Sequence, residues 1–322
     1  MKLTGTPNPQ RSRLPALRPS LILPVLIFII AEALTPIISA AQSSDVPHRI
    51  YSSAKSGFDD FDSMARALEN MDVVFVGETH DDPETHRLEL LLLASLYEKR
   101  RNVAISLEMF ERDTQTIIDS YLAGAIAEEE FLKQSRPWPR YRTDYRPLVE
   151  FARAHKLPVI ASNVPRRLAT GVATGGGLSV LTRLPPEEMQ WIAAEISAPR
   201  DGYWSRFRGI MGNHNGSTMD EARLFAFYEA QCLKDDTMAE AIARFWQGAP
   251  SPKPLVIHYN GSFHSNYGDG TVARTRSRLP VAKIAVITIA PVENLDSINV
   301  SAEAGKADYL IFCLRTKKIE RK

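Results

Sequence analysis

The sequence predicts an α/β fold with a mostly parallel central sheet flanked by helices. From residue 71 onward, short apolar runs alternate with helical segments, as in a sheet whose parallel strands are connected by helices. The runs at 72–77 and 103–107 are continuous and rich in β-branched residues, which is typical of strands buried on both faces. Glycines and other breakers at 170–186 interrupt the alternation, so we expect an inserted helical subdomain over about 170–250.

The first 41 residues are expected to be a secretory signal peptide. Lys2 and three arginines precede an apolar stretch at 21–30, and the small residues at 39–41 offer a cleavage site. An uncleaved anchor is the alternative, although about ten apolar residues interrupted by Pro24 are too few to span a bilayer. We therefore expect an exported protein, periplasmic or secreted, that is membrane-associated only if this segment stays uncleaved.

Composition narrows the possible partners. Without the four basic residues and one acidic residue of the first 41, the chain has 35 Lys and Arg against 37 Asp and Glu, a net charge of −2. A nucleic-acid partner is not expected at this balance. Cys232 falls in a helical stretch and Cys313 in an apolar run. We expect buried thiols at both positions, although export would also permit a disulfide.

The elements follow in order along the chain. A lead-in segment at 42–70, with an amphipathic helix around 59–69, precedes the α/β domain, which we place at 71–322. Asp82 and Pro83 supply an N-cap and a first-turn proline for a helix that ends near residue 100. We expect further helices at 113–134 (two, broken at Gly124), 148–155, about 186–196 and 217–248, the last with a break at 235–237, and further strands at 158–162, 255–260 and 281–289, with an edge strand at 310–314.

Side chains able to do chemistry follow three of the predicted strands. Glu78 and His80 follow the first strand and Glu108 the second, while His264 follows the strand at 255–260. Both histidines end a Gly-x-x-His pattern. Because ligands bind at the carboxyl ends of parallel strands, we expect these four residues to share one pocket. His86, in the first turn of the next helix, could face the surface or the interior.

Two kinds of chemistry suit this set of two imidazoles and two carboxylates. Glu78, His80, Glu108 and His264 could hold a divalent metal ion with a water in the open position, or they could work as acid and base without metal. The sequence contains no Walker-type phosphate loop, no Gly-x-Ser-x-Gly elbow and no dinucleotide fingerprint. Nucleotide binding and a serine-esterase mechanism are therefore disfavoured.

Two irregular segments are rich in aromatic and guanidinium groups. Residues 136–147 could stack on a flat ligand and pair with its acids, or they could form a structural lid. Residues 203–215 combine aromatics with Met and His, which indicates a binding surface or a set of aromatic staples under a long loop.

Four motifs, in this order, resemble the ChaN family of haem-binding iron-uptake proteins, whose superfamily also includes the Tiki and TraB proteins and the erythromycin esterases. They are the segments FVGETH at 75–80, SLEMF at 106–110, DYRP at 144–147 and NGSFHSNYG at 260–268. The resemblance runs from about residue 55 to 290. It implies an exported α/β protein that binds haem, with a homodimer holding two haems and a haem receptor or transporter as further partners. Lipoprotein members carry a cysteine at the cleavage point, which is absent from residues 1–41.

The resemblance also implies a tyrosine as iron ligand. The motif match favours Tyr145, with Tyr141 and Tyr203 behind it, and a phenolate suits ferric haem. Nearby side chains are then expected to pair the propionates or to cover the porphyrin: Arg142, Arg146, Arg166, Arg206 and Arg208 for the propionates, and Trp138, Trp204, Phe207 and Met211 for the ring. His214 is expected as a further haem-binding residue.

The wider superfamily implies an alternative, a hydrolase that acts on an ester or a peptide. In that interpretation Glu78, His80, Glu108 and His264 are catalytic or metal-ligating residues. Haem binding does not obviously require this cluster, so the sequence leaves both functions open.

Overall fold

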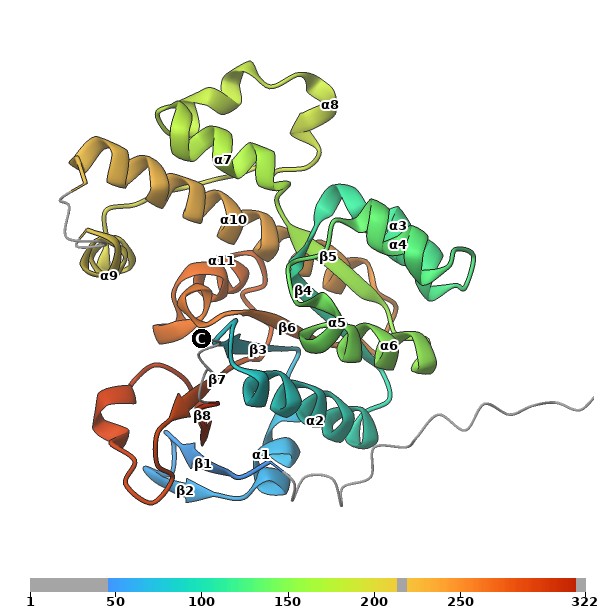
Figure 1. Ribbon diagram of the computed structural model, residues 1–322, viewed down its shortest axis with the longest axis vertical. Helices are drawn as coiled ribbons and strands as arrows, with labels where there is room; N and C mark the ends of the chain where they lie inside the picture. The colour runs from blue at the N-terminus through green and yellow to red at the C-terminus, as the bar shows by residue number, and fades with distance from the viewer. Residues whose placement is uncertain (1–45, 213–218, 317–322) are drawn as a thin grey trace, which may run out of the picture. The chain divides into compact units, whose positions relative to one another are not determined.

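Residues 46–212 and 219–316 are described by the structure, a computed structural model in which they form one eight-stranded sheet with helices on both faces (Figure 1). The strands lie in the order β2-β1-β8-β7-β3-β6-β4-β5. Their bounds are β1 His48–Ser52, β2 Gly57–Asp59, β3 Val73–Glu78, β4 Val103–Glu111, β5 Val159–Asn163, β6 Leu255–Gly261, β7 Ile284–Val292 and β8 Tyr309–Leu314. The predicted signal peptide, residues 1–41, lies outside the described residues.

The pairing of the strands confirms a mostly parallel sheet. All neighbours from β8 to β5 are parallel, and β1 joins β8 and β2 by antiparallel pairing. The expectation of an edge strand at 310–314 is wrong, because β8 lies between β7 and β1. The lead-in segment provides β1 and β2, and these two strands cover the edge that β8 would otherwise expose.

Helices connect the parallel strands. Their bounds are α1 Phe61–Leu68, α2 Pro83–Lys99, α3 Gln115–Leu122, α4 Glu128–Ser135, α5 Tyr141–Asp144, α6 Arg146–His155, α7 Arg166–Gly175, α8 Pro186–Met189, α9 Gly202–Met211, α10 Glu221–Gly248 and α11 Gly270–Arg278, with short 3-10 turns η2 Arg112–Thr114, η3 Leu178–Arg183, η5 Ser262–His264, η6 Asn266–Gly268 and η7 Val300–Glu303. α2 begins as expected, since the Asp82 side chain accepts hydrogen bonds from the amides of Glu84 and Thr85. The helix expected at 186–196 is limited to α8.

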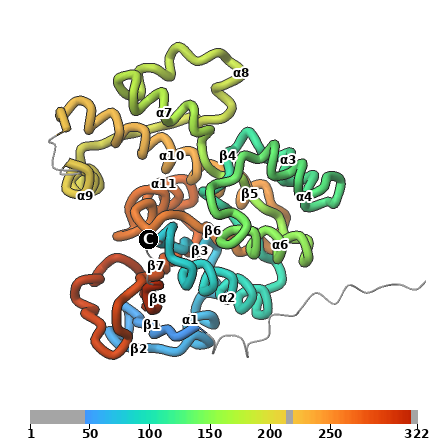
Figure 2. Tube along the Cα trace, viewed as in Figure 1, coloured from blue at the N-terminus to red at the C-terminus, as the bar shows by residue number. Residues whose placement is uncertain are grey.

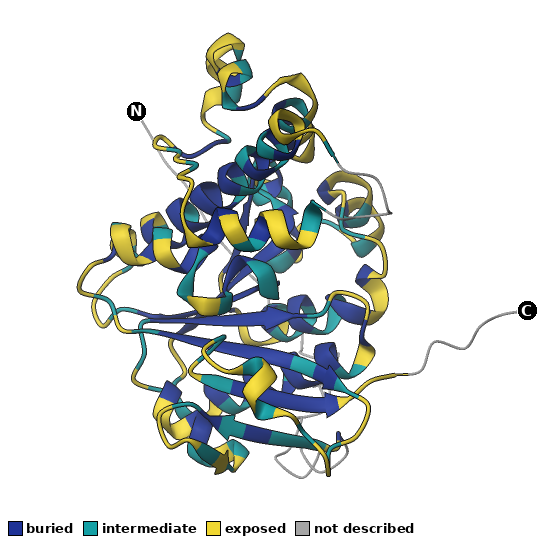
Figure 3. Cartoon of the chain, turned by 90° about the vertical axis from the view of Figure 1, so that its left-hand side faces the viewer, coloured by how far each residue is buried: buried dark blue, intermediate teal, exposed yellow. Residues whose placement is uncertain are grey.

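The alternation of side chains along β3 explains how both faces of the sheet are buried. Val74 and Val76 belong to an apolar cluster with residues of α1, α2 and α6, whereas Val73 and Phe75 pack with residues of α10 and α11. Figure 3 shows the strands as a buried layer between helices whose outer sides are exposed. A continuous apolar run is therefore what this strand requires.

The helical insertion leaves the sheet after β5 and returns at β6, a path that Figure 2 traces through α7 to α10. Contrary to expectation, α10 does not break at 235–237. Its polar residues there are buried but bonded: Asp236 accepts from Arg274 and Arg278, and the Thr237 hydroxyl accepts from the amide of Ala193. The Asp236 contacts hold α10 against α11, and the Thr237 contact holds the segment after α8 against α10.

The two cysteines agree with a further expectation. Cys232 and Cys313 are buried free thiols, as predicted. Among the described helices, none combines the length and the apolar character needed to cross a membrane.

Candidate functional site

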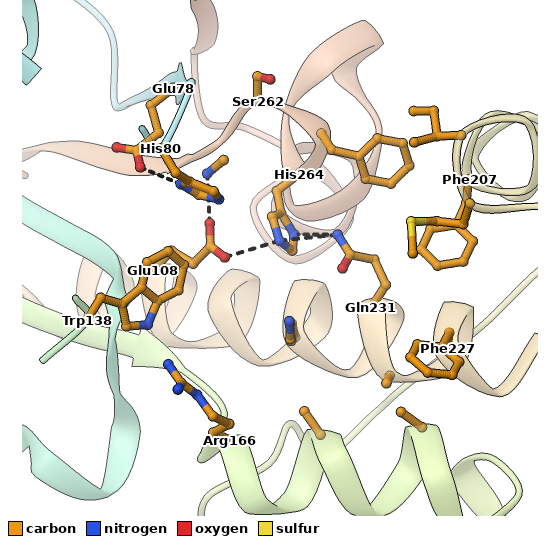
Figure 4. A pocket seen from close by; sticks show the side chains of 18 of the residues that line it. Glu78, His80, Glu108, Trp138, Arg166, Phe207, Phe227, Gln231, Ser262 and His264 are labelled. Atoms are coloured by element: carbon orange, nitrogen blue, oxygen red, sulfur yellow. Dashed lines mark hydrogen bonds and ion pairs between the residues drawn. The ribbon is translucent and has the colours of Figure 1, made fainter. Parts of the chain in front are cut away.

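A pocket lies at the carboxyl ends of β3, β4 and β6. Glu78, His80, Glu108 and His264 all line it, and its volume is about 870 Å³. Since β6 lies between β3 and β4, the two glutamates stand on either side of Gly261, which pairs with Glu78 in the sheet and donates its amide to Glu108 at 2.7 Å. The four strand-end residues therefore meet in one pocket, as expected (Figure 4).

Glu78 is buried at the end of β3 and fixes the orientation of His80. Its Oε1 accepts hydrogen bonds from Nδ1 of His80, at 2.6 Å, and from the hydroxyl of Tyr145, at 2.8 Å. Burial alone would raise the pKa of Glu78, but the hydrogen bond from His80 and the charges of His86 and His80 outweigh burial and lower it. Glu78 is thus an ionised carboxylate that keeps the proton of His80 on Nδ1.

The His80 ring remains 48% exposed at the pocket wall. It lies against Gly261, where an added Cβ would come within 2.7 Å of both Cε1 and Nε2 of the ring, so only glycine leaves space for it. Burial opposes protonation of His80, but the Glu78 hydrogen bond and the charge of Glu108 outweigh it and raise its pKa above 6.5.

His264 lies between two carboxylates. Its Nε2 is 3.3 Å from Glu108 Oε1, and its Nδ1 is 2.7 Å from Oδ1 of Asp235 on α10. Burial opposes the charged imidazolium, but the charges of Glu108 and Asp235 and their hydrogen bonds raise the pKa of His264 to about 10. Burial would likewise raise the pKa of Glu108, but the charge of His264 holds it well below its usual range. His264 is therefore a cation at neutral pH.

A second polar layer lies behind Glu78. His86 is buried and contacts Glu89 through Nδ1 and the His80 carbonyl through Nε2, so its interior orientation is the correct alternative. Burial first, and the charge of Glu78 second, raise the pKa of Glu89 well above 4.5. Asp144 lies 3.5 Å from the other side of the His86 ring.

Three acids that the sequence reasoning missed are Glu89, Asp144 and Asp235. Glu89 stands among leucines in α2, Asp235 lies between Lys234 and Asp236 in α10, and both acids are fully buried. For Glu89 the available signal was an acid among apolar residues of a helix, because a buried carboxyl group needs a partner. For Asp235 the polar run at 235–237 was interpreted as a helix break.

Most of the remaining pocket lining is apolar, and it includes two cations and one acid, Asp81. Phe207, Phe227 and Phe263 line it together with Ile210, Met211 and small side chains of α7. Arg166 and Lys234 supply positive charge, and among the described residues neither forms an ion pair. Figure 4 shows Phe207 and Phe227 across from the Glu78 and His80 pair, with His264 between Glu108 and Gln231.

The residues expected to bind haem fall into two groups. Arg166, Phe207, Trp138 and Met211 line the pocket, whereas Tyr141, Tyr145, Tyr203, Trp204, Arg142, Arg146, Arg206 and Arg208 do not. His214 lies outside the described residues. Several of the second group are already engaged: Arg146 pairs with Glu128, Arg206 with Asp269 and Arg208 with Glu221.

The predicted iron ligands are engaged as well. The Tyr145 hydroxyl is buried and donates to Glu78, and the Tyr203 hydroxyl donates to Asp235 at 2.9 Å. The Tyr141 hydroxyl is buried without a hydrogen-bond partner among the described residues. Ligation by Tyr145 would require its hydroxyl to leave Glu78.

Comparison with solved structures finds the same fold in ChaN of Campylobacter jejuni, a protein described by its cofacial haem binding. The TM-score is 0.59 at 15% sequence identity, over 84% of this chain and 97% of that one. A mutant of the erythromycin esterase EreC in its open conformation matches with a TM-score of 0.44 and 12% identity, over 84% and 83% of the two chains. The type III effector HopBA1 matches with a TM-score of 0.47 and 11% identity, over 88% and 100%.

Among curated proteins, none matches the sequence. The family model described as haem-binding uptake, Tiki superfamily, ChaN matches residues 64–275, which span all strands and helices that build the pocket. This match covers more than half of the chain. The chain therefore belongs to the ChaN family of haem-binding uptake proteins in the Tiki superfamily.

Proposed function

We propose that this chain binds haem in the pocket between the sheet edge and the helical insertion. The observation that carries the proposal is the pocket itself, whose wall combines aromatic and aliphatic side chains with an exposed imidazole and with two cations that form no ion pair among the described residues. Its volume of about 870 Å³ lies within the range of small-molecule and cofactor sites. Such a wall suits the faces of a porphyrin.

The two propionates would pair with Arg166 and Lys234. Both cations line the pocket and, among the described residues, neither is neutralised by an ion pair. Arg146, another of the predicted partners, is bound to Glu128 at 2.6 Å outside the pocket. A guanidinium that is free of protein carboxylates is the better partner for a ligand carboxylate.

His80 is the side chain best placed to ligate iron. Metal-ligating histidines commonly donate their other ring N–H to a carboxylate, and Nδ1 of His80 already contacts Glu78 in this way. His264 is unsuitable, because its two ring nitrogens face Glu108 and Asp235 and the ring is protonated. Tyrosine ligation stays a prediction for Tyr145. Bound haem would supply a redox-active iron, and these residues would orient and hold it.

Hemin titration tests the proposal. The wild type should show a saturable Soret shift with one hemin per chain. Arg166→Gln should weaken binding about tenfold, or ~1.4 kcal/mol, through loss of a charge-assisted bond, whereas Arg183→Gln, an exposed arginine of the same insertion outside the pocket, should not. His80→Ala should change the Soret position.

The outcome for Tyr145→Phe assigns the ligand. If this variant loses the ferric spectrum and His80→Ala keeps it, the tyrosine is the ligand. Equal affinity in the wild type and Arg166→Gln would contradict the propionate assignment.

An acid/base hydrolase is the second candidate function, and Asp235 is the observation that favours it. Glu108, His264 and Asp235 form a buried carboxylate–imidazole–carboxylate row that reaches the pocket. A protonated His264 could give its proton to a leaving group, while a carboxylate orients a water. Hydrolysis of a nitrophenyl ester should then exceed the buffer rate and fall in Glu108→Gln. An unchanged rate in that variant would reject this function.

Export and assembly are further parts of the proposed role. We propose that residues 1–41 direct the chain across the membrane, that two chains form a homodimer around two haems, and that a receptor or transporter exchanges haem with it. Size-exclusion chromatography with light scattering, with and without hemin, tests the dimer. A monomer at saturating hemin would reject it.

A further inference from the structure

Behind the pocket, three buried acceptor groups converge with too few protons to satisfy them. Nδ1 of His86 lies 2.9 Å from Oε2 of Glu89 and 3.8 Å from Oε2 of Glu78. One ligand atom from each residue falls within 4.8 Å of the other two. Among the described residues, Glu78 Oε2 and Glu89 Oε1 have no hydrogen-bond partner although both side chains are buried. Buried polar atoms of this kind require an explanation.

The environment of His86 identifies which nitrogen carries the proton. Its Nε2 is 3.1 Å from the carbonyl oxygen of His80, and a carbonyl oxygen only accepts, so Nε2 must donate. In the neutral ring, Nδ1 then carries no proton, and its lone pair faces the two glutamates. A lone pair and two carboxyl groups at this spacing need a positive charge among them, which a proton or a metal ion can supply.

The surrounding groups resemble the outer shell of a metal site. The other oxygen of Glu78 is held by Tyr145 and His80, and the His80 carbonyl fixes the tautomer of His86. Outer contacts of this kind orient metal ligands and set their basicity. A tetrahedral ion with ligands at about 2.1 Å holds them roughly 3.4 Å apart, so small side-chain rotations would close the site.

We propose that His86, Glu78 and Glu89 bind a divalent transition-metal ion. One imidazole and two carboxylates suit Zn²⁺, Mn²⁺ or Fe²⁺. Glu78 lines the pocket, so the proposed site lies directly behind the pocket wall. This site shares only Glu78 with the set of four strand-end residues expected to hold a metal, in which each histidine pairs with a separate carboxylate.

Metal binding is measured on the haem-free protein, so that its result is independent of haem binding. Chelator-treated protein is titrated with Zn²⁺ against a chromophoric chelator, and with Co²⁺ while the visible d–d bands are recorded. The wild type should bind one ion per chain with a tetrahedral or five-coordinate Co²⁺ spectrum. Glu89→Gln, which keeps the shape of the side chain, should weaken Zn²⁺ binding at least tenfold and abolish the Co²⁺ bands.

Two further variants complete the test. Glu98→Gln changes an exposed acid of the same helix and should bind as the wild type does. His264→Gln alters the pocket but not the proposed ligands and should retain the ion. If the wild type binds no more Zn²⁺ than Glu89→Gln does, a shared proton fills the site and the proposal is overturned. Loss of the ion in His264→Gln together with its retention in Glu89→Gln would also overturn the proposal.

Discussion

The position of His264 between two carboxylates predicts how the stability of the protein depends on pH. The groups that face it are Glu108 from β4 and Asp235 from α10, with Lys234 and His80 further away. Its pKa rises from 6.5 to about 10 on folding, so the folded protein binds this proton more tightly than the unfolded chain does. The resulting stabilisation is complete below pH 6.5 and is lost as the pH rises toward 10.

The size of this loss in the free energy of unfolding follows from the pKa shift of His264. At 1.36 kcal/mol per unit, a group with these two pKa values contributes about 3 kcal/mol less to the free energy of unfolding at pH 9 than at pH 6. His80, whose pKa is also raised, adds a change of the same sign. The variant Asp235→Asn isolates the contribution of His264, because it removes one of the two carboxylates and leaves Glu108 in place.

Urea unfolding at pH 6 and pH 9 measures this difference. The wild type should lose about 3 kcal/mol between the two pH values, and Asp235→Asn should lose clearly less. A direct NMR titration of the His264 ring should show it still protonated at pH 8. A wild-type free energy that is unchanged between pH 6 and 9, or a variant that loses as much as the wild type, would refute the assigned charge of His264.

Two further substitutions test the geometry around Glu78 and His80. Tyr145→Phe removes a hydrogen bond to a buried carboxylate and should lower the free energy of unfolding by about 1.5–3 kcal/mol, measured by urea denaturation; a change below the experimental error would contradict the buried bond. Gly261→Ala places a Cβ within 2.7 Å of the His80 ring and should displace it, which lowers hemin affinity in titration while the far-ultraviolet spectrum stays that of a folded protein. Wild-type affinity in Gly261→Ala would mean that His80 does not contact the haem.

The parallel part of the sheet could be predicted from local sequence, because strands buried on both faces must be continuous apolar runs. The same reasoning located Glu78, Glu108 and His264, since a strand end fixes where the next residues lie. The antiparallel strands β1 and β2 could not be predicted in this way. They are short, and β1 pairs with β8 at the far end of the chain, a contact that no local pattern records.

Side-chain direction was the harder part of the site. Tyr145 was expected to ligate iron, and that stays a prediction. Its hydroxyl faces Glu78, and this direction depends on how α5 and α6 pack on α2. Asp235 was misinterpreted for a related reason. A polar residue within a helix indicates either a break or a buried partner, and only the fold brings His264 to it.

Hemin titration of a variant with a blocked pocket tests the central proposal most directly. Ala173 lies in α7 on the pocket wall, and Thr174 is the next residue, exposed and outside the pocket. A tryptophan at 173 should fill the space needed by the porphyrin, so Ala173→Trp should lose the saturable Soret shift, whereas Thr174→Trp should bind one hemin per chain like the wild type. Equal hemin binding by all three proteins would place the haem elsewhere and contradict the proposed function of the pocket.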